Sequence, residues 1–140
     1  MSSELGTDYG SAAPREASLE RIDDDALPAR IERLSTQQID ALPFGVVRLD
    51  AEGIVTFYSR TEAEQSGFRD RRAIGRNFFT QLAPCLSTPD RVRRIEEARR
   101  AGTLDITFEQ IGDFDDAERE LHVRVLSASG GGVWVLLERP

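Results

Sequence analysis

The sequence contains no lysine, and it has only one cysteine, one histidine, one methionine and one tryptophan in 140 residues. A single cysteine cannot form an internal disulfide, and Cys85 with His122 is too small a ligand set to predict a zinc site. No apolar run approaches the roughly 20 residues of a membrane-spanning helix. Residues 1–6 show neither the basic nor the apolar region of a secretory signal. We therefore expect a cytoplasmic protein with no membrane segment.

Acidic residues outnumber basic ones, 25 to 18, so the formal net charge is -7. Binding to nucleic acid needs clustered positive charge, so this balance argues against nucleic acid as a partner. The length predicts one domain that is large enough to bury a core.

The first part of the chain reads as an extension followed by short helices. A flexible or helical N-terminal extension is predicted over residues 1–28, with a weak helical pattern over 17–25. Pro28 suits the first turn of a helix over 29–34. Ser35 and Gln38 form a capping-box pattern for another short helix that runs to residue 39. The folded domain is expected over residues 29–140.

The remaining chain predicts five strands and two further helices. Strands are expected over 44–49, 54–58, 104–111, 118–127 and 133–138. Apolar residues alternate in the third and fourth of these, and the last is typical of a buried or end strand. Helices are expected over 59–65 and 88–102, the second capped by Thr88 and ended by Gly102. The order predicts an α+β domain, with one five-stranded antiparallel sheet that carries helices on one face. The N-terminal extension is expected to cover the other face.

The cysteine lies in a distinctive place, directly after a proline. Pro84 fixes its own φ and favours extended geometry at Ala83, so the backbone that leads to Cys85 is constrained. Taken alone, a single cysteine among apolar residues is usually a small core side chain. The alternative is that the thiol is a point of attachment.

Several motifs together resemble the photoactive yellow protein family, whose members are small blue-light receptors with a PAS fold. The resemblance covers roughly residues 29–140, and residues 1–28 resemble a longer form of the family's N-terminal helical cap. The residues that carry it are Phe44-Gly45-Val46-Val47-Arg48-Leu49-Asp50, Tyr58, Glu62, Ile74-Gly75-Arg76-Asn77-Phe78-Phe79, Ala83-Pro84-Cys85, Gly102 and Val133-Trp134-Val135.

The resemblance implies that Cys85 carries p-coumaric acid as a thioester. Tyr58 and Glu62 match the two hydrogen-bond donors to the buried phenolate, which requires a protonated Glu62 because only a neutral carboxyl can donate. Ser66 matches a hydroxyl that orients Tyr58. Phe78 matches a residue packed near the chromophore. Ala83 and Pro84 set the approach to the thiol.

The implied activity is blue-light sensing. By this resemblance, light would isomerise the chromophore from trans to cis, Glu62 would then give its proton to the phenolate, and the N-terminal cap would loosen as the signal. The downstream signalling partner is unknown, and a monomer or weak dimer is expected.

Three positions depart from the family pattern. Phe68 stands where the family has the arginine that shields the pocket, although Arg69 is adjacent. Asp116 falls where the family has a pocket methionine, and Gly112 where it has an aromatic residue. These departures bear on colour and recovery rate more than on attachment of the chromophore.

The sequence leaves two alternatives to blue-light sensing. A chromophore-free PAS module for dimerisation or partner binding would have the same fold and leave Cys85 in the core. A cysteine enzyme would need a base near the thiol. His122 is expected on a distant strand at an outward-facing position, so an enzyme is not predicted.

Overall fold

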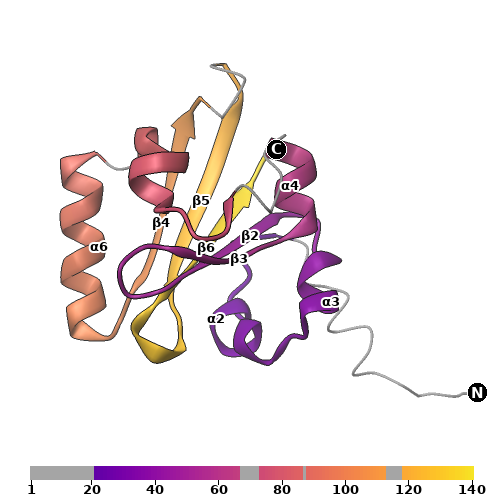
Figure 1. The fold of residues 1–140 in the computed structure, drawn as a ribbon, viewed down its shortest axis with the longest axis horizontal. Helices are drawn as coiled ribbons and strands as arrows, with labels where there is room; N and C mark the ends of the chain where they lie inside the picture. Colours follow the sequence, from indigo (N-terminus) through magenta and orange to yellow (C-terminus); the bar gives the residue numbers. More distant parts are fainter. Residues whose placement is uncertain (1–20, 67–72, 87, 113–117) are drawn as a thin grey trace, which may run out of the picture.

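The structure is a computed structural model that describes residues 21–66, 73–86, 88–112 and 118–140. One five-stranded sheet, in the order β3-β2-β6-β5-β4, forms the middle layer (Figure 1). All of its neighbouring strands are antiparallel. The α+β class and the five-stranded antiparallel sheet expected from the sequence are confirmed. The strands are β2 (Gly45–Leu49), β3 (Val55–Tyr58), β4 (Asp105–Ile111), β5 (Glu120–Ser127) and β6 (Val133–Glu138).

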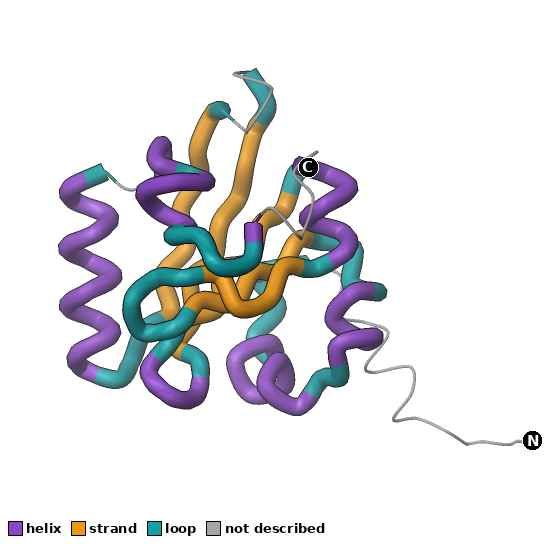
Figure 2. Tube along the Cα trace, viewed as in Figure 1, coloured by secondary structure: helices purple, strands orange, loops and turns teal. Residues whose placement is uncertain are grey.

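The inner face of the sheet packs against the segments between β3 and β4. These are α4 (Arg60–Ser66), a π-helical turn η2 (Phe78–Leu82), a 3-10 turn η3 (Pro84–Leu86) and α6 (Pro89–Ala101). Figure 2 shows that helical turns and loops alternate here. Alternate residues of the central strands meet these helices in one buried cluster, which includes Val47, Val123, Val125, Val135 and Leu137.

The outer face of the sheet is covered by the N-terminal part of the described chain. It contains α2 (Leu27–Arg30), the 3-10 turn η1 (Ile31–Arg33) and α3 (Thr36–Asp40). Ile22, Leu27 and Ile31 are buried with Trp134 and Leu136 of β6 in a second apolar cluster. We call residues 21–40 the cap. The capping box predicted at Ser35 and Gln38 is present.

The start of the cap differs from the sequence prediction. A helix was expected over 17–25, but the described residues 21–25 form turns. The Asp24 carboxylate accepts a hydrogen bond from the Ala26 N–H at 2.8 Å, and this side-chain bond competes with helix formation. The regular helix begins only at Leu27, with Pro28 in its first turn as predicted.

Two polar contacts, one of them at the buried Arg124, fasten the cap to the sheet. The Arg124 guanidinium of β5 donates to the backbone carbonyls of Ile22 and Asp24, each at 2.8 Å, and forms a two-point ion pair with Asp105. The Glu32 carboxylate accepts from the Trp134 indole N–H at 2.7 Å and from the Ser129 N–H at 2.8 Å. Because each contact joins residues distant in sequence, they fix where the cap sits.

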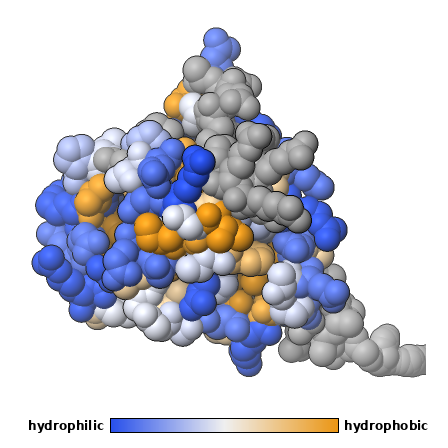
Figure 3. Space-filling model, viewed as in Figure 1, coloured by the Kyte–Doolittle hydropathy of each residue, from blue (hydrophilic) through white to orange (hydrophobic). Residues whose placement is uncertain are grey.

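The surface seen in Figure 3 is mainly hydrophilic, with an apolar patch near the centre of the view. The large apolar side chains exposed among the described residues are Ile74, Val92 and Ile111. None of the described helices is both long enough and apolar enough to cross a bilayer.

Candidate functional site

The site is built where β3 passes into α4. Ser59, between these elements, is fully buried, and its hydroxyl accepts the Glu62 N–H at 3.1 Å and the Val46 N–H at 3.0 Å. One serine therefore caps the helix and ties its first turn to β2. A glutamate at this helix position often turns back toward the cap. Here Glu62 points into the protein instead.

Glu62 is fully buried and forms a two-point ion pair with Arg139. The distances are 2.7 Å from Nη1 to Oε1 and 2.9 Å from Nη2 to Oε2, and neither side chain is exposed to solvent. Arg139 directly follows β6, and the C-terminus lies beside α4 in Figure 1. Removing one member of such a pair leaves a buried charge, which typically costs about 3–5 kcal/mol. The geometry is that of a carboxylate held by a guanidinium.

Gly45 at the start of β2 makes room for the Glu62 carboxylate. A Cβ atom at this position would overlap Glu62 Oε1. The carboxylate thus lies directly against the β2 backbone, so the glycine at this point of the sequence is explained by the close approach of the side chain.

Tyr58 and Ser66 lie beside Glu62 on the inner face. The hydroxyl groups of Tyr58 and Ser66 are 3.0 Å apart and buried, in agreement with the contact that the family resemblance implies. Tyr58, Phe78 and Ala83 belong to the same buried cluster. Four of the predicted site residues, Tyr58, Glu62, Ser66 and Phe78, are thus buried against one region of the sheet.

The cysteine segment follows Phe78 in tight turns. The Ala83 N–H donates to the Phe78 carbonyl at 2.7 Å, which closes the π-helical turn, and Pro84 is exposed at the start of η3. The Phe78 ring meets Phe79 edge to face at 5.2 Å between centroids. The backbone of Cys85 lies within η3, whereas Phe68 and Asp116 lie outside the residues that the structure describes.

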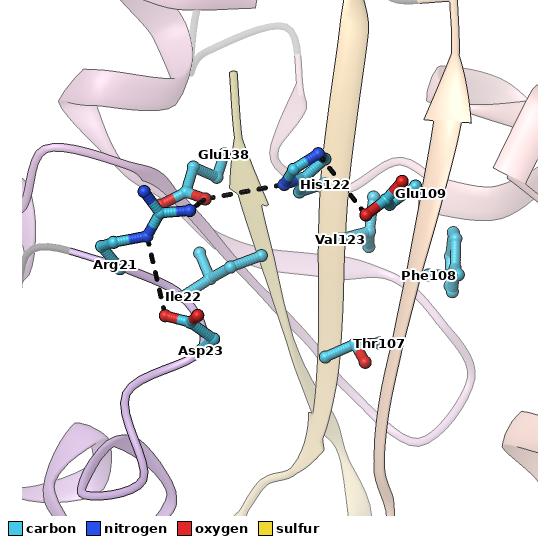
Figure 4. A pocket seen from close by; sticks show the side chains of 9 residues that line it. All are labelled: Arg21, Ile22, Asp23, Thr107, Phe108, Glu109, His122, Val123 and Glu138. Atoms are coloured by element: carbon cyan, nitrogen blue, oxygen red, sulfur yellow. Dashed lines mark hydrogen bonds and ion pairs between the residues drawn. The ribbon is translucent and has the colours of Figure 1, made fainter. Parts of the chain in front are cut away.

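A separate surface pocket of about 400 Å³ lies at the outer face of the sheet (Figure 4). The His122 Nε2–H donates a hydrogen bond to the Glu120 carboxylate at 2.8 Å. Glu109 and Glu138 each lie 3.8 Å from a ring nitrogen. The Glu120 hydrogen bond and the surrounding carboxylates raise the pKa of His122, against a smaller effect of burial. His122, Glu109 and Glu120 are also the described residues whose donor atoms gather closely enough to hold a cation.

The sequence and the fold resemble those of known proteins. Residues 35–138 match the family model described as the PAS fold, which makes the chain a PAS protein. The photoactive yellow protein of Rhodothalassium salexigens is 33% identical over 103 residues, covering 73% of this chain and 82% of that protein. The protein of the same name from Halochromatium salexigens is 28% identical over 116 residues, covering 82% and 93%. The chain belongs to the photoactive yellow protein family.

A solved structure agrees with the assignment. The photoactive yellow protein domain of the sensor histidine kinase Ppr from Rhodospirillum centenum superposes with a TM-score of 0.71 at 34% identity. The match covers 80% of this chain and 99% of that domain.

The sequence reasoning missed Arg139. A signal for it was present, because Val133, Val135 and Leu137 alternate toward the inner face and residue 139 continues that alternation. The buried acid at Glu62 was predicted, and a fully buried acid is rarely found without a partner. The two observations together would have pointed to an arginine on the inner side of β6.

Proposed function

We propose that this protein is a blue-light photoreceptor that carries p-coumaric acid as a thioester on Cys85. The observation that supports this most is the burial of Tyr58, Glu62 and Ser66 together on the inner face, in a chain of the photoactive yellow protein family. Bound there, p-coumaric acid supplies absorption of blue light and trans–cis isomerisation.

The residues present fit a buried phenol. Tyr58 has one hydroxyl proton, so it can donate to the phenol oxygen only if Ser66 donates to Tyr58 Oη. The 3.0 Å contact between the two hydroxyls allows this direction. The apolar wall formed by Phe78 and Ala83 excludes water, which strengthens hydrogen bonds to a buried charge.

Glu62 is the residue proposed to exchange a proton with the phenol. Its first task is to donate a hydrogen bond from a protonated carboxyl, and its second is to release that proton after illumination. The Arg139 ion pair bears on both tasks, because a guanidinium favours the carboxylate. A stabilised carboxylate makes release of the proton easier and the donating state harder to reach.

The proposed signal is a loosening of the cap, and α4 touches it directly. The Arg60 N–H donates to the Asp40 carboxylate at 2.8 Å, and the Thr61 hydroxyl lies 3.3 Å from the Asp40 carbonyl. The same hydroxyl donates to the carbonyl of Leu42, two residues beyond the cap, at 2.7 Å. A new charge on Glu62 in the first turn of α4 would act on these bonds at the end of α3. The partner that reads the change is an unidentified signalling protein.

The second candidate is a PAS module without a chromophore, used for dimerisation or partner binding. The observation that favours it is the same ion pair, since Arg139 satisfies Glu62 with no ligand present. An attachment experiment separates the two candidates.

The test is to incubate the purified protein with an activated p-coumaroyl ester and to measure intact mass and visible absorbance. We expect a single adduct and a visible band for the unmodified sequence, and neither for Cys85→Ser. Absence of an adduct would exclude the photoreceptor. Tyr58→Phe and Glu62→Gln should each shift the visible band of the loaded protein, and unchanged bands in both would refute the assigned roles.

A further inference from the structure

The Glu62–Arg139 pair is the feature that the family's chemistry does not account for. A donor carboxyl must be neutral, yet Glu62 accepts two hydrogen bonds from a guanidinium that is itself fully buried. Arginine keeps its charge at any accessible pH. Since a buried cation needs an anion, Arg139 and a neutral Glu62 are compatible only when another anion is beside them.

We propose that Arg139 is a positioning residue of this site, whose guanidinium holds Glu62 as a carboxylate until an anionic ligand replaces that charge. The inference rests on the proposed function for the identity of the ligand, a phenol, but the pair itself is a property of the chain alone. Arg139 then has an anion beside it in either state, first Glu62 and then the ligand.

The proposed exchange moves one proton between the ligand and Glu62. Without ligand, Glu62 is the anion. When a phenol enters and is bound as its phenolate, the proton leaves the phenol oxygen and goes to a Glu62 carboxylate oxygen, with no net uptake from water. Glu62 can then donate a hydrogen bond, and Arg139 becomes the counter-ion of the ligand. Release of that proton returns Glu62 to the carboxylate that Arg139 already fits.

The position of Arg139 gives this exchange a structural consequence. Gly45 and the Ser59 cap hold Glu62 in place from β2 and from α4. Arg139 also reaches the Gln65 side-chain oxygen at 3.4 Å. Breaking the Glu62–Arg139 ion pair therefore releases the contact that holds the end of β6. The opposite face of this strand packs against the cap through Trp134 and Leu136.

The first experiment uses the protein without chromophore and records the infrared C=O stretch of protonated carboxyl groups. We expect no such band from Glu62 in the unmodified sequence, so that Glu62→Gln removes nothing from the spectrum. In Arg139→Met a new band should appear, and it should be lost in Glu62→Gln/Arg139→Met. Arg139→Lys, which keeps the charge, should suppress the band.

Either of two results would overturn the proposal. One is a band in the unmodified sequence that Glu62→Gln removes, because Glu62 would then be neutral beside Arg139. The other is an unchanged spectrum in Arg139→Met. The comparison of the unmodified sequence with Glu62→Gln needs no substitution at Arg139, so it tests the proposal even if Arg139→Met does not fold. Urea unfolding adds a second readout, in which the midpoint shifts of the two single variants should exceed in sum that of the double variant.

The second experiment repeats the spectrum after p-coumaroylation. We expect loading to produce the Glu62 band in the unmodified sequence, whereas Arg139→Met shows it before and after loading. An adduct without the band would refute the exchange at Glu62. Failure to form any adduct would remove the proposed photoreceptor function and leave the result on the unloaded chain standing.

Discussion

Replacing Arg124 with methionine should release the cap from the sheet without unfolding the domain. Arg124 donates to the carbonyls of Ile22 and Asp24 at 2.8 Å each, and its remaining donors meet Asp105 at 2.9 and 2.8 Å. Its side chain is 7% exposed, against 45% for Asp105. Methionine keeps an apolar stem in the same place and removes only the charged donors.

The magnitude follows from these contacts. A hydrogen bond from a charged donor contributes roughly 1.5–3 kcal/mol, so the two bonds to the cap give an upper limit of about 6 kcal/mol. The ion pair adds under about 1 kcal/mol because Asp105 remains partly in water. Burial of the apolar methionine offsets some of the loss. We expect opening of the cap to become easier by about 2–4 kcal/mol, which corresponds to roughly 30-fold to several hundred-fold.

Amide hydrogen exchange measures this opening residue by residue. The Leu27 and Arg30 N–H groups are bonded to the Asp24 and Ala26 carbonyls, and they report on the cap. Their exchange should accelerate by the factor given above, while that of Val125 in the central sheet changes far less. Arg124→Lys, with one charged group in place of the fork, should give an intermediate effect.

Two outcomes would refute the reasoning. Unchanged exchange at Leu27 and Arg30 would mean that apolar packing alone holds the cap. An equal acceleration at Val125 would mean that Arg124 stabilises the whole domain and not the cap in particular.

Three further predictions concern single sites. Gly45→Ala places a Cβ on the Glu62 carboxylate and should lower the free energy of unfolding by about 1–3 kcal/mol in urea titrations, whereas an unaltered value would contradict the close approach. Ser35→Ala removes the capping bond to the Gln38 N–H and should cost about 1 kcal/mol in thermal unfolding, with Ser35→Thr as the control that keeps it. The pKa of His122 is raised above its usual 6.5, so its contribution to stability is complete below that value and is lost as the pH rises through the folded pKa. His122→Gln should therefore lower stability in acid and leave it unchanged in alkali, and an equal loss at both would argue against titration.

Much of the fold could be predicted because the local signals agree with each other. Apolar residues alternate in β4 and form a continuous run in β6, and both patterns are typical of strands. The caps at Ser35 and Thr88 mark real helix starts. Burial of Glu62 and the Tyr58–Ser66 contact agree with what the family resemblance implied. Glu62 and Ser66 are four apart in α4 and therefore share a face of that helix.

The remainder depended on contacts between distant parts of the chain. Arg139 meets Glu62 only because β6 pairs with β2, and strand order is not encoded in alternation. The turns over residues 21–25 arise from the Asp24 side chain and from the carbonyls that Arg124 binds. Neither partner can be recognised from the local sequence of the other.

The strand order also has a consequence for folding. β6 is the last strand in the sequence, yet it lies at the centre of the sheet, with Val47 of β2 and Val125 of β5 both paired to Val135. The β2–β3 hairpin and the β4–β5 hairpin therefore have no edge in common until β6 inserts between them. A chain emerging from the ribosome cannot complete its sheet until this final strand is released. Closure of so long a loop makes the nucleus non-local, which favours slow folding compared with a helical bundle of equal size.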